Sequence, residues 1–357
     1  MEHIDLNHAL LLLPDWYARS ARDLPWRKDR EPYHVWISEI MLQQTRVEAV
    51  KAYYIRFMEV LPSIEALAAC DPEKLLKLWE GLGYYSRARN LHRAARTIVS
   101  QYNGIFPDSY AEILSLSGIG PYTAGAIASI AFRIPVSAVD GNVLRVLSRL
   151  REDTRDIADT AVKKEVSNEI TKCLCADPQI DPGIMNQALM ELGATVCLPN
   201  GAPECEACPW TSVCRAAANG TVLQLPVKSR AQKRRIEKHT ILLITDGSRL
   251  LLEKRPAEGL LASLYEPVNL TGWYDTGQVT GIVREMGLSP LRVTRGPDAR
   301  HIFTHIEWEM QGYLIRIEDT AEKETCFFAD RSAIRTSCAI PSAFRTYLSW
   351  LEETGIM

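Results

Sequence analysis

Two carboxylates in the first 140 residues could carry acid–base chemistry. Glu39 lies in an apolar stretch that predicts a helix over 33–44. If Glu39 faces inward, desolvation raises its pKa and makes it a possible general acid near neutral pH, whereas facing solvent it is an ordinary surface residue. Asp140 lies in an Asp-Gly-Asn turn that precedes the helical pattern Val143–Leu150, where its ordinary role is to cap that helix.

A glycine turn lies about twenty residues before Asp140. Gly118 and Gly120 bracket Ile119, which permits a tight turn, and Pro121 suits the first turn of a new helix. Backbone amides at such a turn and at a helix N-terminus can bind a phosphate, as in the helix-hairpin-helix clamp on DNA. The alternative interpretation is an ordinary corner between two helices.

Four of the nine cysteines are close together in the sequence. They fall within eighteen residues, at Cys197, Cys205, Cys208 and Cys214. Four thiolates with this spacing could hold zinc or a 4Fe–4S cluster, and spacing alone leaves both open. The other five are scattered and predict plain core or surface thiols: Cys70, Cys173, Cys175, Cys326 and Cys338.

Length and composition describe a soluble globular protein. With 357 residues, 46% hydrophobic and 24% charged, two domains are expected. No apolar run is long enough to span a membrane, and no signal peptide is visible, so a cytoplasmic protein is expected, nucleoid-associated if bacterial. In that compartment, nine cysteines favour metal binding over disulfides.

The net charge of −3 carries no global basic signal, so any nucleic-acid binding must come from local patches. The candidate patches are Arg87, Arg89, Arg93 and Arg96, then Arg145, Arg149 and Arg151, and the run Lys228–Lys238.

Hydrophobic periodicity divides the chain into a helical part and an α+β part. Helices are predicted over 5–21, 33–44, 46–59, 72–79, 84–102, 108–116, 121–132, 141–150, 159–174 and 183–196, and no strand signal precedes residue 220. Pro14 either kinks the first of these or starts a second helix. Beyond the basic segment 219–238, two strands flank an Asp246-Gly247 hairpin turn. A helix near 275–286, β-rich stretches over 300–317 and a terminal helix over 341–353 follow.

Four motifs in order resemble the adenine DNA glycosylase (MutY) family across nearly the whole chain. They are Pro-Trp-Arg followed by Ser-Glu-Ile-Met-Leu-Gln-Gln-Thr, then Gly-Leu-Gly-Tyr-Tyr-Ser-Arg, then Gly-Ile-Gly-Pro-Tyr-Thr to Val-Asp-Gly-Asn, and the four cysteines. The resemblance implies a 4Fe–4S cluster as the cofactor at these cysteines. Seven residues separate Cys197 from Cys205 where the family pattern has six, which lengthens one loop.

The implied substrate is double-stranded DNA containing adenine mispaired with 8-oxoguanine or guanine. The adenine must leave the base stack to be reached, which costs a few kcal/mol and less at a mispair. By resemblance, Glu39 protonates adenine and Asp140 stabilises the positively charged sugar, the two-carboxylate logic of glycoside cleavage. Tyr122 matches a third active-site residue.

The resemblance also implies how base and duplex are contacted. Trp26, Arg27 and Gln187 match residues near the flipped adenine. The duplex-contacting set is Gln44, Thr45, Leu82 and Tyr84, with Gly118, Ile119 and Gly120 of the hairpin. Leu82 or a tyrosine could act as a wedge between bases.

The predicted fold class is an all-α helix-hairpin-helix glycosylase domain with an iron–sulfur motif, followed by a smaller α+β Nudix-like domain. The helical domain spans 1–218, with a barrel at 25–134 and a cluster-bearing subdomain formed by 1–24 and 135–218. A basic linker at 219–238 leads to a mispair-recognition domain at 239–357.

This last domain lacks the Nudix hydrolase signature, of which only Arg284–Gly287 is similar to the end, so a binding role is expected. Phe303, Thr304 and His305 match the family's loop for 8-oxoguanine, with threonine where serine is common. We expect a monomer.

Three alternatives differ in chemistry. An endonuclease III-like enzyme acting on damaged pyrimidines would need a lysine where Tyr122 stands, because its Schiff base requires an amine. A non-catalytic DNA-binding protein would require neither Glu39 nor Asp140. A zinc-bound Nudix hydrolase of free nucleotides would require the missing glutamates.

Overall fold

The computed structural model describes residues 5–229, 233–318 and 326–356. They divide into two compact units, one formed by residues 1–69 and 90–230 and the other by residues 70–89 and 231–357. The second unit therefore combines the C-terminal part of the chain with a short segment that is inserted, in sequence, within the helical part.

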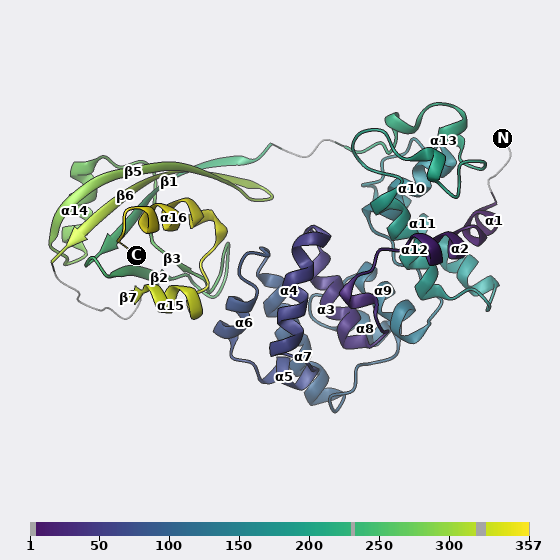
Figure 1. Cartoon of the computed structure of the whole chain (residues 1–357), viewed down its shortest axis with the longest axis horizontal. Coiled ribbons are helices and arrows are strands. Elements are labelled where there is room, and N and C mark those ends of the chain that lie inside the picture. Colours follow the sequence, from purple (N-terminus) through teal and green to yellow (C-terminus); the bar gives the residue numbers. More distant parts are fainter. Residues whose placement is uncertain (1–4, 230–232, 319–325, 357) are drawn as a thin grey trace. The chain divides into compact units, whose positions relative to one another are not determined.

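The first unit is helical throughout its described residues (Figure 1). Its elements are α1 (Leu6–Leu11), α2 (Leu13–Ser20), the 3₁₀ turn η1 (Pro25–Arg27), α3 (Pro32–Leu42), α4 (Val47–Val60), α5 (Ile64–Ala69), most of α7 (Ser86–Gln101), α8 (Tyr110–Ser115), α9 (Pro121–Phe132), α10 (Gly141–Arg151), α11 (Thr160–Ala176), α12 (Pro182–Thr195), η2 (Cys205–Ala207), α13 (Arg215–Ala218) and η3 (Val222–Gln224). The helical prediction for this part of the chain is confirmed. Pro14 stands in the first turn of α2, so it starts a second helix rather than kinking one.

The end of the predicted cluster-bearing subdomain has its own apolar core. Buried side chains of α1, α2, α10, α11 and α12 surround Trp210, whose indole N–H donates to the carbonyl of Ala9 at 2.7 Å. This single contact connects the cysteine loop to the N-terminal helix, so the two ends of the helical region stabilise each other.

The second unit contains α6 (Pro72–Leu78) and a seven-stranded sheet in its described residues. The strands are β1 (Arg235–Thr245), β2 (Arg249–Lys254), β3 (Tyr265–Glu266), β4 (Val268–Thr271), β5 (Pro290–Ile302), β6 (Ile306–Ile317) and β7 (Cys326–Asp330). Their order is β3-β2-β1-β6-β5, with β4 also paired to β1 and β7 to β2. Strands β1 and β6 run parallel, and the other pairs are antiparallel.

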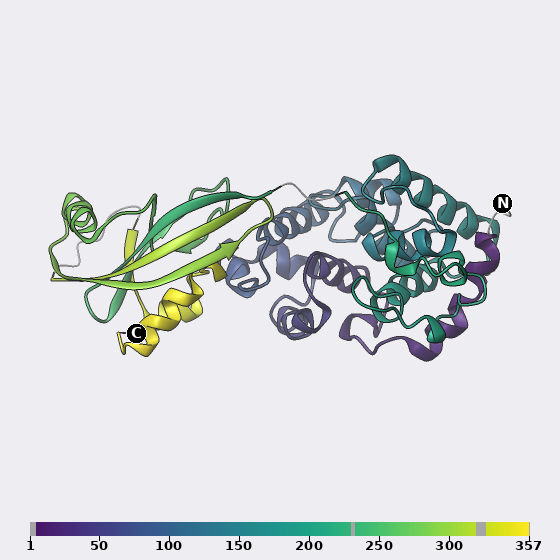
Figure 2. The same ribbon diagram turned by 90° about the horizontal axis from the view of Figure 1, so that it is seen from above.

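Helices cover both faces of this sheet. One apolar core lies between the sheet and α15 (Arg331–Thr336) with α16 (Arg345–Glu353), and a second lies between the sheet and α14 (Thr276–Glu285). Figure 2 shows α16 against one face. The predicted α+β class is confirmed, and Gly247 takes a φ of +101° in the predicted hairpin turn.

The starts of two strands differ from the sequence prediction. Strand β1 begins at Arg235, inside the predicted linker, because residues 235–238 pair with β6. Strand β5 begins at Pro290 rather than 300, since charged side chains at irregular spacing conceal the β pattern. Residues 230–232 of the predicted linker and the side chain of Cys326 lie outside the described part of the chain.

Candidate active site and cysteine pocket

Glu39 faces the interior of the first unit. Every residue of α3 from Val35 to Met41 is buried, and Glu39 is only 7% exposed. Burial raises the pKa of its carboxyl to about 7, the neighbouring charge of Asp140 adds to this, and a hydrogen bond from Tyr122 with the charge of Arg27 opposes it. Of the two orientations that the sequence left open, the inward one is observed, so Glu39 can hold a proton near neutral pH.

Tyr122 is the direct partner of Glu39. It is the second residue of α9, and its hydroxyl donates to Oε2 of Glu39 at 2.7 Å and contacts Sδ of Met190 at 3.0 Å. Burial first, then the charges of Glu39 and Asp140, raise its pKa well above the usual value. The phenol is therefore protonated at neutral pH and acts as a fixed donor.

Asp140 caps helix α10. Its carboxylate accepts hydrogen bonds from the backbone N–H of Asn142 and Val143 at 2.9 and 2.8 Å, and from the side-chain amide of Asn142 at 2.7 Å. Burial raises the pKa of Asp140, while these donors lower it and favour the carboxylate. The capping role and a catalytic role are compatible, because a carboxylate fixed at a helix N-terminus keeps one orientation.

A buried amide positions the segment that ends at Asp140. Oδ1 of Asn186 accepts from the N–H of Ala138 at 2.9 Å, and its Nδ2 donates to the carbonyl of Val136 and to the hydroxyl of Ser129. A Cβ at Gly125 of α9 would lie 2.1 Å from the carbonyl oxygen of Ser137, so α9 needs glycine at this close approach.

Arg27 and Gln187, two of the predicted adenine-pocket residues, share the neighbour Tyr17. The Arg27 guanidinium lies 5.5 Å from the ring centroid of Tyr17, whose hydroxyl donates to Oε1 of Gln187 at 3.2 Å. Nη2 of Arg27 donates to the buried Glu191 at 2.8 Å. The third predicted residue, Trp26, is buried edge-to-face against Tyr54, with ring centroids 5.5 Å apart.

Sequence reasoning missed Tyr17, Met190 and Glu191. Glu191 accepts from Arg22 and Arg27, and although burial opposes ionisation, these bonds lower its pKa to about 2. Met190 and Glu191 could have been found from the sequence. They lie three and four residues after Gln187 and therefore share its face of α12.

The two hairpin glycines have different roles. Gly118 takes a φ of +78°, and a Cβ there would lie 2.5 Å from the Cβ of Asn90. Gly120 has a negative φ, caps α9, and faces open space. Ile119 between them is buried. The turn therefore requires glycine at 118, whereas at 120 the fold tolerates a side chain that a bound phosphate would not.

Gln44 and Thr45 follow α3 directly. Gln44 is exposed in a left-handed conformation with φ of +57°, and the N–H of Thr45 donates to the carbonyl of Leu42 at 3.2 Å. The helix therefore ends with a polar turn at the surface.

The other predicted duplex-contacting residues belong to the second unit. Leu82 is 5% exposed, whereas Tyr84 is 48% exposed with a φ of +47°. Between these two possible wedges, the tyrosine is the accessible one. Arg87, which belongs to one of the candidate basic patches, donates to the carbonyls of Leu82 and Gly83, both at 3.0 Å, and so stabilises this loop.

Phe303, Thr304 and His305 form the turn between β5 and β6. Phe303 packs against Trp308, with ring centroids 4.9 Å apart, while Thr304 and His305 are exposed. Thr304 lies 3.1 Å, hydroxyl to hydroxyl, from Tyr84. Both line a pocket of about 390 Å³ with Gly83–Ser86, Arg89, Gly259–Leu261, His301–Ile306, Pro341 and Ser342.

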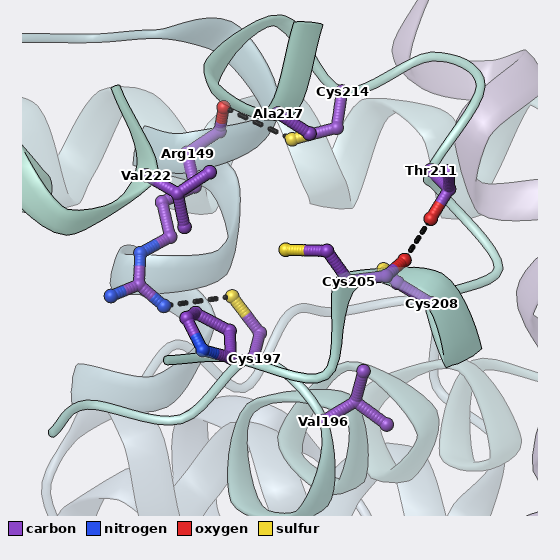
Figure 3. Close-up of a pocket in the computed structure, with 10 residues that line it drawn as sticks. Arg149, Val196, Cys197, Cys205, Cys208, Thr211, Cys214, Ala217 and Val222 are labelled. Carbon is purple, nitrogen blue, oxygen red and sulfur yellow. Dashed lines mark hydrogen bonds between the residues drawn. The ribbon is translucent and has the colours of Figure 1, made fainter. Parts of the chain in front are cut away.

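The four clustered cysteines line one small pocket (Figure 3). Among the described residues, no three His, Cys, Asp or Glu side chains are placed to hold a single metal ion. Burial raises the pKa of Cys208 to about 12, so this thiol needs a bound cation to ionise at neutral pH. Four thiols that line one pocket are the type of donor set that a 4Fe–4S cluster requires.

Two arginines of α10 hold the cysteine loop. Nη1 of Arg149 lies 3.2 Å from Sγ of Cys197, and Arg145 donates to the carbonyls of Cys197 and Gly193 at 2.9 and 2.7 Å. The interpretation of Arg145 and Arg149 as a DNA patch is wrong, because both side chains are buried and satisfy internal acceptors. Arg145 also donates to Oδ1 of Asn142, the residue whose amide bonds to Asp140.

Helix α14 lies where a Nudix hydrolase would carry its paired glutamates. Its acidic content is Glu285 alone, and a capping box between Asp275 and Gln278 starts the helix.

None of the helices in the described part of the chain has both the length and the apolar character needed to cross a bilayer.

Comparison with known proteins gives two family matches. Residues 37–172 match the HhH-GPD superfamily of base excision DNA repair proteins, and residues 239–350 match the NUDIX domain. Adenine DNA glycosylase of Arabidopsis thaliana is 40% identical over 71% of this chain and 46% of its own length. The mouse adenine DNA glycosylase is 37% identical over 86% of this chain and 70% of its own length. The match thus spans less than half of the plant relative.

A solved structure extends the comparison to the fold. A thermostable thymine-DNA glycosylase superposes with a TM-score of 0.53 at 27% identity, over 59% of this chain and 96% of its own. The helical fold therefore occurs in an enzyme named for another base, so the residues of the site, not the fold, must decide specificity.

Proposed function

The chain belongs to the adenine DNA glycosylase family, and from this premise we propose that it removes adenine mispaired with 8-oxoguanine or guanine from double-stranded DNA. One observation carries the proposal: a buried carboxyl, Glu39, whose pKa is raised to about 7, receives a hydrogen bond from Tyr122 and lies within the electrostatic influence of Asp140. Two carboxyls in one buried site match the cleavage of a glycosidic bond.

In the proposed reaction, Glu39 acts as the acid and Asp140 as the stabilising anion. Glu39 transfers its proton to N7 of the flipped adenine, the C1′–N9 bond breaks, and its electron pair leaves with the base. Asp140 stabilises the positive charge that develops on the sugar. Water then adds to C1′ and returns a proton to Glu39.

Tyr122 separates this proposal from the lyase alternative. A glycosylase that nicks DNA forms a Schiff base with a lysine amine, and the phenol at this position cannot do so. We therefore propose a monofunctional enzyme, which needs added base or heat for strand scission.

Single-turnover release of adenine from a duplex with adenine opposite 8-oxoguanine tests the proposed reaction. We expect release from this duplex and from the adenine:guanine duplex, with no borohydride-trapped adduct. Failure on both duplexes together with activity on oxidised pyrimidines would make the endonuclease III-like alternative correct.

We propose that Cys197, Cys205, Cys208 and Cys214 bind a 4Fe–4S cluster. A bound cluster would tie the cysteine loop together and contribute to folding, because its ligands close the helical domain. Support comes from the pocket these cysteines share and from the Arg149 guanidinium, which lies beside one sulfur. Purified protein is expected to be yellow-brown with about four irons per chain. Colourless active protein with stoichiometric zinc would contradict this.

We further propose that the domain at 239–357 reads the base opposite adenine. Removing adenine from a correct pair would be mutagenic, so the enzyme must check the other strand. Thr304 and His305 offer an exposed hydroxyl and an imidazole for this reading, and the hydroxyl of Tyr84 lies beside Thr304.

A further inference from the structure

Lys77 forms an unusual set of contacts within the second unit. It lies in the last turn of α6, and its ammonium donates to Oε2 of Glu80 at 2.6 Å and to the carbonyls of Ile334 and Cys338 at 2.7 and 3.0 Å. The other carboxylate oxygen of Glu80 accepts from the N–H of Ile340 at 2.7 Å. One ion pair therefore satisfies three backbone groups of the segment 334–340.

Both side chains of the pair are partly shielded from water. The Lys77 side chain is 14% exposed and that of Glu80 is 29% exposed. Ile334 lies near the C-terminal end of α15, where carbonyls lack helical partners and a cation is favourable.

The pocket that contains Tyr84 and Thr304 is called the reading pocket here. The contacts of the Lys77–Glu80 pair lie next in sequence to two of the segments that line it. Gly83 and Tyr84 line the pocket just after Glu80 in sequence, and Pro341 and Ser342 line it directly after Ile340. Arg89 adds a second connection, since its Nη1 donates to the carbonyl of Ala262, beside the pocket residue Leu261. The pocket is thus assembled from segments far apart in sequence, and the pair joins two of them.

We propose that Lys77 and Glu80 are positioning residues for the reading of the base opposite adenine. They fix the loop that carries Tyr84 against the segment 334–340, which leads into the pocket residues Pro341 and Ser342. Tyr84 is thereby held at the position from which its hydroxyl meets that of Thr304. Neither residue needs to touch DNA for this role. The inference rests on the proposed function of the pocket.

The test compares Lys77→Met with Lys74→Met in the full-length protein. Both changes remove one positive charge from α6, but Lys74 is exposed, whereas Lys77 bonds to the segment 334–340. The measurement is the ratio of single-turnover adenine release opposite 8-oxoguanine to that opposite guanine. For a coupled contact we expect Lys77→Met to lower this ratio about fivefold or more, with Lys74→Met at the wild-type ratio.

Two further variants separate positioning from general stability. Lys77→Arg keeps a cation with several donors and is expected to restore most of the ratio. Glu80→Gln keeps an acceptor for Ile340 but removes the charge facing Lys77, so a smaller fall in the same direction is expected. If the Lys77→Met protein does not fold, Glu80→Gln is the variant that tests the proposal.

Thr304→Ala distinguishes failure of this inference from failure of the proposed function. If Thr304→Ala lowers the ratio while Lys77→Met and Glu80→Gln behave like Lys74→Met, the positioning role is wrong and the reading role stands. If Thr304→Ala also leaves the ratio unchanged, the pocket does not read the base.

Discussion

Glu39 and Asp140 show how two carboxyls in one site acquire different properties from their immediate partners. Glu39 receives one hydrogen bond from a neutral phenol in an apolar helix face, so burial dominates and its pKa rises to about 7. Burial also raises the pKa of Asp140, but three hydrogen bonds at the start of α10 oppose that rise and favour its charged form. Their different surroundings fit an acid paired with a stabilising anion.

The pKa of Glu39 predicts how adenine release depends on pH. A general acid works only while it is protonated, so the rate of the chemical step should be flat below about pH 7 and fall as the pH rises further. Glu39→Gln should abolish release at every pH while mispair binding remains, because the amide keeps the shape but cannot donate the proton. Single-turnover rates across this range, with binding measured in parallel, check both points. A rate that rises steadily from pH 6 to 9 would exclude Glu39 as the acid.

The raised pKa of Glu39, which serves catalysis, also predicts a loss of folding stability at high pH. The folded pKa of Glu39 lies above the unfolded value of 4.5, so ionisation destabilises the fold. Its contribution is fully favourable below about pH 4.5 and is lost as the pH rises to about 7. Glu39→Gln should therefore be more stable than the wild type at pH 8, by about 3 kcal/mol, and gain nothing near pH 4.5. Denaturant unfolding at the two pH values measures this, and an equal difference at both would mean that the buried charge is not the cause.

Among the elements, the hairpin before α9 separates what the fold needs from what DNA binding needs. Gly118 is required by its positive φ and by the nearby Cβ of Asn90, whereas Gly120 faces open space.

Alanine substitutions at the two glycines should therefore have different effects. Gly118→Ala is expected to lower the free energy of unfolding by about 1–3 kcal/mol, because both strain and a steric clash result. Gly120→Ala is expected to keep wild-type stability and to weaken binding to undamaged duplex DNA, since its methyl group would occupy the space of a bound phosphate. Thermal unfolding and DNA titration of both variants check this. Equal DNA affinity of Gly120→Ala and wild type would favour an ordinary helix corner.

The long periodic elements of this fold could be predicted from sequence, and so could the short helices α6 and α8, which follow turn signals. Helices such as α7 and α11 have an apolar face, so periodicity located them within a few residues. Helices α5 and α15, with six residues each, were missed. Strand β5 carries many charged residues, and its pairing with β6 rather than its own pattern makes it a strand.

The candidate site divides in the same way. Glu39, Tyr122 and Asp140 were singled out from local motifs, and the structure brings them together from three separate helices. Arg145 and Arg149 were misinterpreted because sequence shows their charge but not their direction. Tyr17 contacts Gln187 from 170 residues away, and no local pattern can report such a contact.

At the scale of the whole molecule, the division into two units predicts that the proposed recognition of the opposite base can be separated from adenine release. The described chain stays with the helical unit up to residue 229, since the carbonyl of Val227 accepts from Ile157 and Ser229 donates to Asp156. The solved thymine-DNA glycosylase consists almost entirely of the matching helical region. A helical fragment is therefore expected to fold without the C-terminal domain.

Truncation after residue 229 tests this separation. The fragment should remain folded, bind its cluster, and release adenine from mispairs. It should lose discrimination between 8-oxoguanine and guanine worth roughly 1–3 kcal/mol, the value of one base-reading contact. The release ratio of fragment and full-length protein measures the loss, and His305→Ala in the full-length chain should reproduce part of it. An unchanged ratio would place recognition wholly in the helical unit.

The inserted position of residues 70–89 also has a consequence for the order in which the protein matures during synthesis. Lys77 finds its carbonyl acceptors 257 and 261 residues later in the chain. At ribosomal speeds these acceptors emerge roughly 13–50 seconds after α6, and the helical residues up to 229 are complete well before them. Each new molecule therefore passes through an interval in which the groups proposed to release adenine have been made but the pocket proposed to check the opposite base has not. A nascent chain released early would be able to release adenine without the proposed check of the opposite base.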